Sequence, residues 1–313
     1  MKSKPLMSSD NERDSITNSG AYPCLDVSVV IPAYNEEDSI VAQIRAIHGV
    51  MQKTEKSYEI IVVDDGSTDD TAKKVADEQA RLLSLPQNRG YGAALKAGIK
   101  EAQSEIIVII DSDRTYPCTA IPELLAKAHE NDMVVGARIG KNVSIPLARR
   151  PAKWFLNVLA NYLSGKHIPD LNSGLRVLKK SLVERYSHLL PSGFSFTTTI
   201  TLAMLCNEHQ VLYLPIDYYP RVGRSKIRPI HTYYFLMLII RTIVYFNPLK
   251  VFLPLGGIFF FAGIAKFIYD IIQWNLSESL LMGMLCMLAA GVIWSIGLLA
   301  DLITKVGLGR IRE

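Results

Sequence analysis

The sequence predicts an α/β protein: a doubly wound, mostly parallel sheet with helices on both faces, followed by a transmembrane α-hairpin. Between Val27 and Ala137, short β-branched runs alternate with helix-like segments, which is the rhythm of βαβ units. Near the other end lie two long apolar runs, 251–272 and 280–300. At 1.5 Å per residue the first would span roughly 33 Å, enough for a hydrocarbon core of about 30 Å.

The elements of the sheet are expected in regular order. The run Glu105–Ile110 is short, apolar and β-branched, which predicts a strand buried on both faces. A helix at Asp38–Met51 has acidic residues at its start, where the helix dipole favours them. The other expected strands are Val27–Ile31, Tyr58–Val63, Arg81–Leu85 and Met133–Ala137, and the other expected helices are Asp69–Ala80, Ala93–Gln103 and Ile121–Asn131.

Composition divides the chain into four parts. Residues 1–22 are rich in Ser, Asn and Lys, which predicts a disordered tail without a secretory signal. Residues 23–229 form the expected soluble domain. Residues 230–248 carry Arg241 among aromatic and aliphatic residues, which favours an amphipathic helix in the membrane interface over a third span. Residues 249–313 hold the hairpin and a C-terminal segment; two buried helices of a soluble core are the less favoured alternative for the apolar runs.

Charge and cysteine content exclude several classes of protein. The net charge of +4, with no long basic run, does not indicate a nucleic-acid-binding protein. Cys24, Cys118, Cys206 and Cys286 are far apart, so neither a zinc site nor a disulfide framework is predicted. Lys and Arg flank the hairpin but are absent from its connector, Gln273–Ser279, so the positive-inside rule places the soluble domain in the cytosol, at a plasma or inner membrane.

Asp111 and Asp113 are the most informative pair of residues. They directly follow the strand that ends at Ile110, and ligands of α/β sheets bind at the carboxyl ends of strands. Buried carboxylates are unfavourable without a compensating cation or donor. A Mg²⁺ ion bridging to phosphate oxygens would compensate them. A solvated acidic turn is the alternative.

Two other loops carry groups that suit a nucleotide. Asp64 or Asp65, at the end of the second strand, can accept hydrogen bonds from a nucleobase or ribose. Gly90 and Gly92 open a helix, where glycines let the backbone approach a diphosphate, although such glycines often form only a turn.

These segments together resemble a known family. PAYNEE (32–37), VDDGSTDDT (63–71), NRGYGAA (88–94) and DSDRTYP (111–117) are similar, in this order, to motifs of the family-2 nucleotide-sugar glycosyltransferases with the GT-A fold, a Rossmann-like sheet. Within that family the chain resembles the polyprenyl-phosphate glycosyltransferases, the dolichyl-phosphate mannose synthase-like branch. That likeness extends to VGAR (135–138), DLNSGLR (170–176), RVGRSK (221–226) and the C-terminal two-helix membrane anchor.

The resemblance implies a role for each matching residue. Asp111 and Asp113 would hold Mg²⁺ or Mn²⁺, and Asp170 would be a third catalytic residue or, equally, a structural cap. The nucleotide sugar would be bound by Pro32, Tyr34, Glu36, Asp64, Asp65, Asn88, Gly90, Gly92 and Ser112. The acceptor phosphate would be held by Arg138, Arg221, Ser225 and Lys226. Thr115 departs from the pattern, because dolichyl-type members often have Gln there; its shorter hydroxyl is expected to act through water.

The reaction implied is inverting transfer of a single sugar from a nucleotide sugar to polyprenyl phosphate at the cytosolic membrane face. GDP-mannose, UDP-glucose and UDP-N-acetylhexosamine remain open as donors, undecaprenyl and dolichyl phosphate remain open as acceptors, and a homo-oligomer is an open alternative. Transfer to another lipid or glycan is a second hypothesis, although the Q-x-x-R-W segment of processive synthases is absent. A third is a non-catalytic membrane protein that binds nucleotide sugar, which the presence of both Asp111 and Asp113 disfavours.

Overall fold

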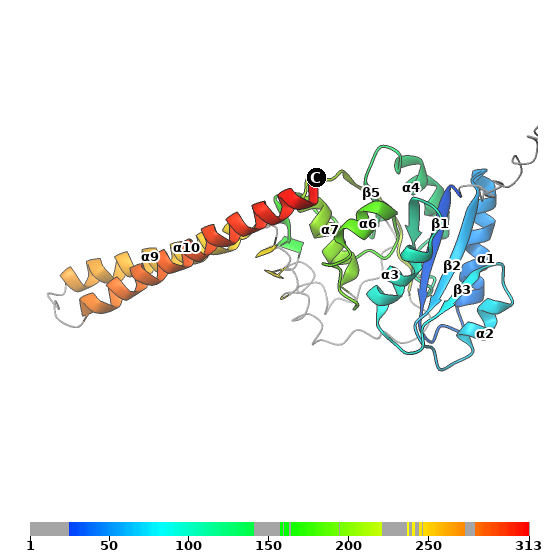
Figure 1. Cartoon of the computed structure of the whole chain (residues 1–313), viewed down its shortest axis with the longest axis horizontal. Helices are drawn as coiled ribbons and strands as arrows, with labels where there is room; N and C mark the ends of the chain where they lie inside the picture. The colour runs from blue at the N-terminus through cyan, green and yellow to red at the C-terminus, as the bar shows by residue number, and fades with distance from the viewer. Residues whose placement is uncertain are drawn as a thin grey trace, which may run out of the picture.

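The molecule consists of a sheet covered by helices and a long helical hairpin that extends away from it (Figure 1). The computed structural model describes residues 25–140, 157–220 apart from 159, 163 and 194, residues 237, 240, 241, 244 and 245, and residues 247–272 and 279–312. The N-terminal tail expected at 1–22 lies outside these residues. Within the expected interfacial helix, 230–248, the described residues 237, 240, 241, 244 and 245 are helical, whereas 247 and 248 are not.

Seven strands form one mixed sheet in the order β3-β2-β1-β4-β6-β5-β7. All neighbouring pairs are parallel except the two that involve β6. The expected doubly wound, mostly parallel sheet is therefore confirmed, and each expected strand exists within two residues of its expected ends. The strands are β1 (Val27–Ala33), β2 (Tyr58–Asp64), β3 (Arg81–Ser84), β4 (Ile106–Ile109), β5 (Met133–Ala137), β6 (Arg176–Lys179) and β7 (Val211–Pro215).

The antiparallel strand β6 was not predicted, and it matters for the site. Arg176, its first residue, pairs with Ile109 near the end of β4 and with Val135 of β5. The start of β6 therefore lies close to the edge where the parallel strands β4 and β5 end. The loop 170–175 that precedes β6 is thereby brought beside the loops that follow β1, β2 and β4.

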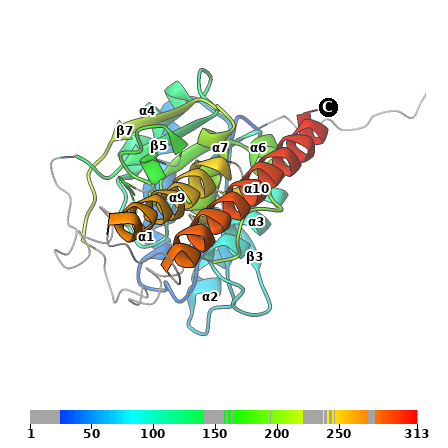
Figure 2. The same cartoon turned by 90° about the vertical axis from the view of Figure 1, so that its left-hand side faces the viewer.

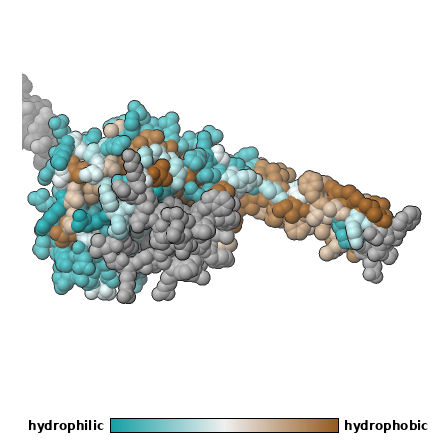
Figure 3. Space-filling model, turned by 180° about the vertical axis from the view of Figure 1, so that it is seen from behind, coloured by the Kyte–Doolittle hydropathy of each residue, from teal (hydrophilic) through white to brown (hydrophobic). Residues whose placement is uncertain are grey.

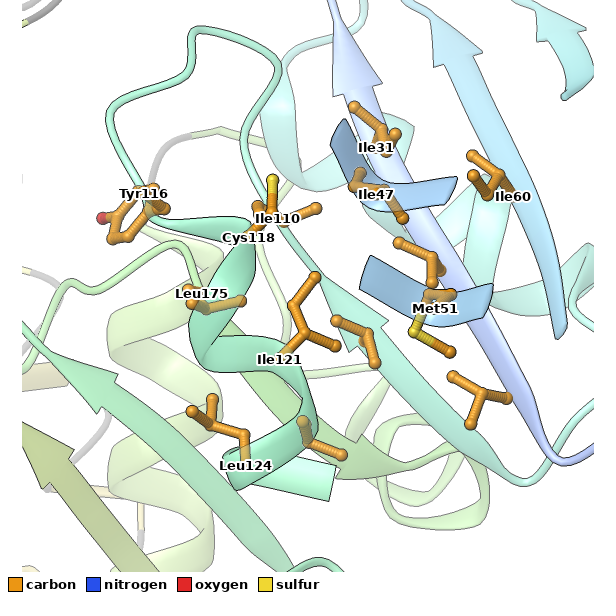
Figure 4. Close-up of a cluster of buried hydrophobic side chains, with 14 of the residues drawn as sticks. Ile31, Ile47, Met51, Ile60, Ile110, Tyr116, Cys118, Ile121, Leu124 and Leu175 are labelled. Atoms are coloured by element: carbon orange, nitrogen blue, oxygen red, sulfur yellow. The ribbon is translucent and has the colours of Figure 1, made fainter. Parts of the chain in front are cut away.

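Two apolar layers hold the helices against the sheet. Alternate residues of β4 point to opposite faces, so Val108 packs in one cluster and Ile107 in the other. Figure 4 shows the first cluster, in which Ile47 and Met51 of α1 meet Ile31 of β1. The helices of that face are α1 (Ile40–Met51), α2 (Thr71–Ala76) and α4 (Ile121–Lys127), and those of the other face are α3 (Tyr91–Glu101), α6 (Lys180–Tyr186) and α7 (Phe196–Cys206).

Three helices are shorter than expected: α1 begins at Ile40 rather than Asp38, so its first turn holds no acidic residue, and α2 and α4 end early. The helix expected to reach Ala80 ends at Ala76, because Glu78 donates its backbone N–H to Val75 and the chain then turns into β3. The helix expected to reach Asn131 ends at Lys127, where Ala128 donates to Leu125. In both α2 and α4 the helix end lies one turn before the following strand.

The C-terminal hairpin is formed by α9 (Leu249–Ile272) and α10 (Ser279–Arg312). Both contain stretches long and apolar enough to cross a membrane, Leu249–Ile272 and Leu281–Lys305, and their surface is largely hydrophobic (Figure 3). They lie side by side when viewed from the free end of the hairpin (Figure 2). A Cβ added to Gly263 would lie 2.9 Å from the carbonyl oxygen of Gly283, so glycine permits the close approach of the two backbones.

Candidate functional site

The candidate site lies along the edge of the sheet where β1, β2 and β4 end. Ala33 at the end of β1 pairs with Asp64 at the end of β2, and Val30 pairs with Ile109 of β4. The loops that follow these strands carry the residues expected to bind a nucleotide sugar. Their backbone conformations are fixed by hydrogen bonds between loops that are far apart in sequence.

The loop after β1 is locked to the loop after β2. Asn35 donates its backbone N–H to Ser67 Oγ at 2.9 Å, and Thr68 N–H donates to Asn35 Oδ1 at 2.8 Å. Asn35 has a φ of 51°, a left-handed conformation that asparagine tolerates better than most residues. These bonds place Tyr34 and Glu36, both partly exposed, in a loop of defined shape beside β2. Pro32, within β1, is buried.

Asp64 and Asp65 make different contacts. Asp65 accepts two backbone hydrogen bonds, from Arg89 N–H at 2.7 Å and from Gly90 N–H at 2.8 Å, one on each carboxylate oxygen. Asp64 Oδ1 accepts from Ser67 N–H at 3.1 Å and so shapes its own turn. Both side chains are buried. Asp65 therefore anchors the loop before α3, a role that the sequence did not predict.

Gly90 and Gly92 contact protein backbone. A Cβ at Gly92 would lie 2.2 Å from Pro191 O, and one at Gly90 would lie 2.6 Å from Ser192 O. The N–H of Ala93 also donates to Ser192 O, at 3.0 Å. The segment 191–193 thus packs against the start of α3, which gives these glycines a packing role; contact of Gly90, Gly92 and the exposed Asn88 with a diphosphate stays a prediction.

Asp111 is held at three points. Tyr91, the first residue of α3, donates its hydroxyl to Asp111 Oδ1 at 2.9 Å, and Gln43 Nε2 donates to Asp111 O at 3.0 Å. A Cβ at Gly174 would lie 2.4 Å from Asp111 Oδ2, so the loop before β6 can approach this carboxylate only through a glycine. Burial, and then the charge of Asp111, raise the pKa of Tyr91 well above its ordinary value, so the phenol stays a donor.

Asp113 is held by Thr115. Asp113 Oδ1 accepts from Thr115 N–H at 3.1 Å and from Thr115 Oγ1 at 2.6 Å, and both residues are buried. The turn between them has Arg114 at a φ of 60°. The expectation that Thr115 acts only through water does not describe this contact, because its hydroxyl bonds directly to the carboxylate. Ser112 is buried in the same turn.

The two carboxylates suit a hard cation that also binds phosphates. Among the described residues no group of three or more His, Cys, Asp and Glu side chains could form a metal cage. Mg²⁺ does not need such a cage, since it is usually bound by one or two carboxylates together with substrate phosphates and water. Asp111 and Asp113, oriented by Tyr91 and Thr115, match that ligand set.

Arg138 and Asp170 form a bidentate ion pair, and Asp170 belongs to the loop that brings Gly174 against Asp111. Arg138 Nε and Nη2 donate to the two oxygens of Asp170 at 2.7 and 2.8 Å, and the side chain of Asp170 is fully buried. The guanidinium also lies over the ring of Tyr218, 5.2 Å from its centroid. Burial opposes the charge of Arg138, but Tyr116 and the Asp170 carboxylate outweigh it, so the pKa of Arg138 is raised well above its ordinary value.

Arg176 is a component to which the sequence reasoning assigned no role. Its side chain is fully buried, and it donates to Ser173 O at 2.7 Å, Leu171 O at 3.0 Å and Thr201 Oγ1 at 2.6 Å. It thereby closes the loop that carries Asp170. Arginines are mostly exposed in proteins, so no sequence pattern signals a buried one. Three expected acceptor residues, Arg221, Ser225 and Lys226, lie outside the described residues.

Comparisons with known proteins agree with this geometry. The chain matches "Glycosyl transferase family 2" over residues 28–187 and "GtrB C-terminal hairpin" over residues 247–306. It is similar in fold to glucosyl-3-phosphoglycerate synthase from Mycobacterium tuberculosis in complex with Mn²⁺, UDP-glucose and phosphoglyceric acid, with 22% identity, a TM-score of 0.56 and coverage of 70% of this chain and 80% of that chain.

The same synthase in complex with Mn²⁺ and UDP has 21% identity, a TM-score of 0.57 and coverage of 70% and 78%. At this level of identity the likeness identifies the GT-A-like fold alone. The family matches go further, because one spans the sheet domain through α6 and the other spans both long apolar helices. The chain therefore belongs to the family-2 glycosyltransferases and carries a GtrB-type C-terminal hairpin.

Proposed function

We propose that this glycosyltransferase moves a single sugar, with inversion, from a nucleotide sugar to a polyprenyl phosphate at the cytosolic face of a membrane. The observation that carries the proposal is the packing of the hairpin base beside the loop that carries Asp170. Val251 of α9 packs against a buried cluster that includes Ile168 and Leu171, the residues on either side of the Pro169-Asp170 pair. An acceptor embedded in the bilayer would thus be met by a site held close to the membrane anchor.

The donor half of the site suits a nucleoside diphosphate sugar. Asp111 and Asp113 would hold Mg²⁺ or Mn²⁺, which when bound neutralises the charge of the departing diphosphate. Asp64 is the better candidate for the nucleoside, because both carboxylate oxygens of Asp65 already accept backbone hydrogen bonds. Pro32, Tyr34, Glu36 and Ser112 would complete this half. Several loops shape the pocket, so the choice among GDP-mannose, UDP-glucose and UDP-N-acetylhexosamine depends on their combined contacts.

The acceptor half needs positive charge more than a base. A phosphate monoester has a second pKa of about 6, so it is largely a dianion at neutral pH and already a nucleophile. A guanidinium carries five N–H donors, so Arg138 can pair with Asp170 and still donate to a phosphate. In this proposal Arg221, Ser225 and Lys226 act with it, and Asp170 orients Arg138 rather than acting on substrate itself.

A donor screen tests the proposal. Membranes containing the protein are incubated with polyprenyl phosphate and each radiolabelled nucleotide sugar, with and without EDTA. We expect one donor to label the lipid only when a divalent ion is present. Asp113→Ala should abolish labelling while the protein remains in the membrane, and the exposed Asp77→Ala should leave labelling unchanged. No labelled polyprenyl phosphate with any donor would refute the acceptor assignment, and EDTA-resistant labelling would refute the metal.

The orientation of the protein in the membrane is tested separately. The positive-inside rule predicts that the sheet domain and the segment after α10 share the cytosolic side. Green fluorescent protein fused after Glu313 should therefore fluoresce in a bacterial host, and alkaline phosphatase at the same position should be inactive. Active phosphatase would place that segment on the opposite side and contradict the proposal.

A further inference from the structure

Tyr91 connects two loops that the proposed donor site needs. It is the first residue of α3, and its hydroxyl donates to Asp111 Oδ1, which belongs to the loop after β4. The other oxygen of Asp111 faces Gly174, where an added Cβ would come within 2.4 Å. The carboxylate is therefore fixed from two sides, by a phenol and by a backbone.

The position of Tyr91 is itself fixed by a residue that follows β2. Asp65, at the end of β2, uses both carboxylate oxygens to bind the N–H groups of Arg89 and Gly90, the two residues before Tyr91. On the other side, Ala93 donates its N–H to Ser192 O at 3.0 Å. Tyr91 is thus held between two anchored stretches of backbone. A continuous chain of contacts runs from Asp65 through the 89–90 backbone and the Tyr91 phenol to Asp111.

We propose that Tyr91 is a positioning residue for the metal-binding carboxylate of Asp111, and that Asp65 acts on metal binding through Tyr91. This inference rests on the proposed function, because it assumes that Asp111 binds the cation. A carboxylate that can rotate presents a lone pair to a cation only part of the time. A hydrogen bond to one oxygen fixes the plane of the group, and losing such an outer-shell contact typically weakens metal binding about 10- to 100-fold.

The matched control is another partly buried tyrosine that packs against the same apolar cluster as Tyr91. Tyr213, on β7, has a hydroxyl that is buried and makes no hydrogen bond within the described part of the chain. Tyr213→Phe and Tyr91→Phe remove the same atom from two tyrosines that pack against one cluster. Only the second removes a hydrogen bond to Asp111. The comparison therefore separates the effect of the contact from the effect of deleting a buried hydroxyl.

Metal binding is measured without sugar or acceptor. Full-length protein in detergent is titrated with Mn²⁺ in the presence of UDP and, in parallel, GDP, and free Mn²⁺ is followed by electron paramagnetic resonance. We expect Tyr91→Phe to weaken Mn²⁺ binding about 10- to 100-fold and Tyr213→Phe to leave it unchanged. Excess Mn²⁺ should restore sugar transfer to Tyr91→Phe but not to Asp111→Ala, a rescue that a general folding defect would not give.

Asp65→Asn tests in a second way whether Tyr91 positions Asp111. An amide supplies a single acceptor oxygen and sets an N–H₂ group against a backbone N–H, so the loop before Tyr91 is released. Asp65→Asn should weaken Mn²⁺ binding, and the double variant with Tyr91→Phe should be no weaker than the weaker single variant. Additive losses would show that Asp65 acts independently of Tyr91 and would overturn that half of the inference.

The outcomes separate this inference from the proposed function. Unchanged Mn²⁺ affinity in Tyr91→Phe overturns the inference alone. Wild-type protein that binds no Mn²⁺ with either nucleotide overturns the metal assignment and the inference with it. Wild-type protein that binds Mn²⁺ but labels no polyprenyl phosphate refutes the acceptor, while the positioning role of Tyr91 still stands on the binding data.

Discussion

Gly174 is a residue at which one added methyl group should damage the site. Its Cβ would lie 2.4 Å from Asp111 Oδ2, and its N–H donates to the buried hydroxyl of Tyr116 at 2.7 Å. Gly174→Ala must therefore displace either the carboxylate or the loop before β6. If Asp111 binds the metal as proposed, we expect transfer to fall at least about 10-fold, as for other losses of orientation around a metal ligand.

The control for that substitution is Gly49→Ala in α1, where an added Cβ meets no atom within 4 Å. It should raise thermal stability, because alanine is more favourable than glycine in a helix by up to about 1 kcal/mol. Transfer rates and melting temperatures of the two variants are compared side by side. A wild-type transfer rate in Gly174→Ala would contradict the close contact between Gly174 and the carboxylate of Asp111.

Arg138 should also be essential to the stability of the domain. Asp170 is fully buried, so removing its bidentate partner leaves an uncompensated charge. Breaking a buried pair in this way costs about 3–5 kcal/mol, whereas an exposed pair contributes about 0–1 kcal/mol. We expect Arg138→Ala to lower the free energy of unfolding several-fold more than Arg81→Ala, which breaks the exposed pair with Glu101. Equal losses in chemical denaturation would refute the structural role.

For single residues, the sequence predicts which side chains belong to the site better than it predicts which residues they contact. Asp111 and Asp113 stand out because they directly follow a β-branched run, which is a local signal. The bond from Arg89 to Asp65 joins residues 24 apart, and the pair of Arg138 and Asp170 joins residues 32 apart. Such contacts depend on loop paths, which periodicity does not encode. The sequence therefore left the choice between Asp64 and Asp65 open.

Among the helices and strands, the strands β1 to β5 were predicted from short apolar runs: β1, β2 and β4 are dominated by Val and Ile, whereas β3 has two central leucines and β5 is apolar at most positions. The strand β6 was not predicted, because its four residues begin and end with a charged side chain, Arg176 and Lys179. The helix α7 has a β-branched, threonine-rich first half yet is helical. Its residues from Phe196 to Leu205 are buried, so tertiary packing overrides local propensity there.

A cluster at the opposite edge of the sheet should make stability pH-dependent. Asp132, just before β5, accepts from Lys179 Nζ at 2.8 Å and Gln210 N–H at 3.2 Å, and its other contact is His209 Nδ1 at 3.1 Å. Burial alone would raise the pKa of Asp132, but the hydrogen bonds from Lys179, Gln210 and His209 outweigh it, so the pKa is lowered.

The direction in which pH changes the stability follows from the lowered pKa of Asp132. The unfolded chain binds a proton at Asp132 near a pH of about 4, before the folded protein does. The contribution of Asp132 to stability is therefore present above that pH and is lost as the pH falls through the folded pKa. Asp132→Asn should flatten the drop in melting temperature between neutral pH and about pH 3, whereas Asp77→Asn should not. Parallel curves for Asp132→Asn and wild type would contradict this.

At the scale of the whole molecule, the sheet domain and the hairpin share a small apolar core. Ala160, Ile168, Leu171, Leu202 and Leu205 are its buried members, and Val251 of α9 packs against them. The first turn of the membrane helix is therefore part of the same packing unit as the loop that carries Asp170. The sequence predicted both the sheet and the hairpin, but it did not predict this junction, because the junction joins segments from four separate parts of the chain.

The junction predicts that a change in the membrane helix alters the site. Val251→Ala removes two methyl groups from the cluster, at about 0.8 kcal/mol for each fully buried carbon. Since Val251 is only partly buried, we expect a loss of about 1 kcal/mol and faster amide hydrogen exchange in the segment from Ile168 to Leu175. Leu253→Ala is the control, because Leu253 lies on the same helix with half of its surface exposed and should leave this exchange unchanged. If the exchange of that segment is the same in both variants and in wild type, the hairpin anchors the domain without shaping its site.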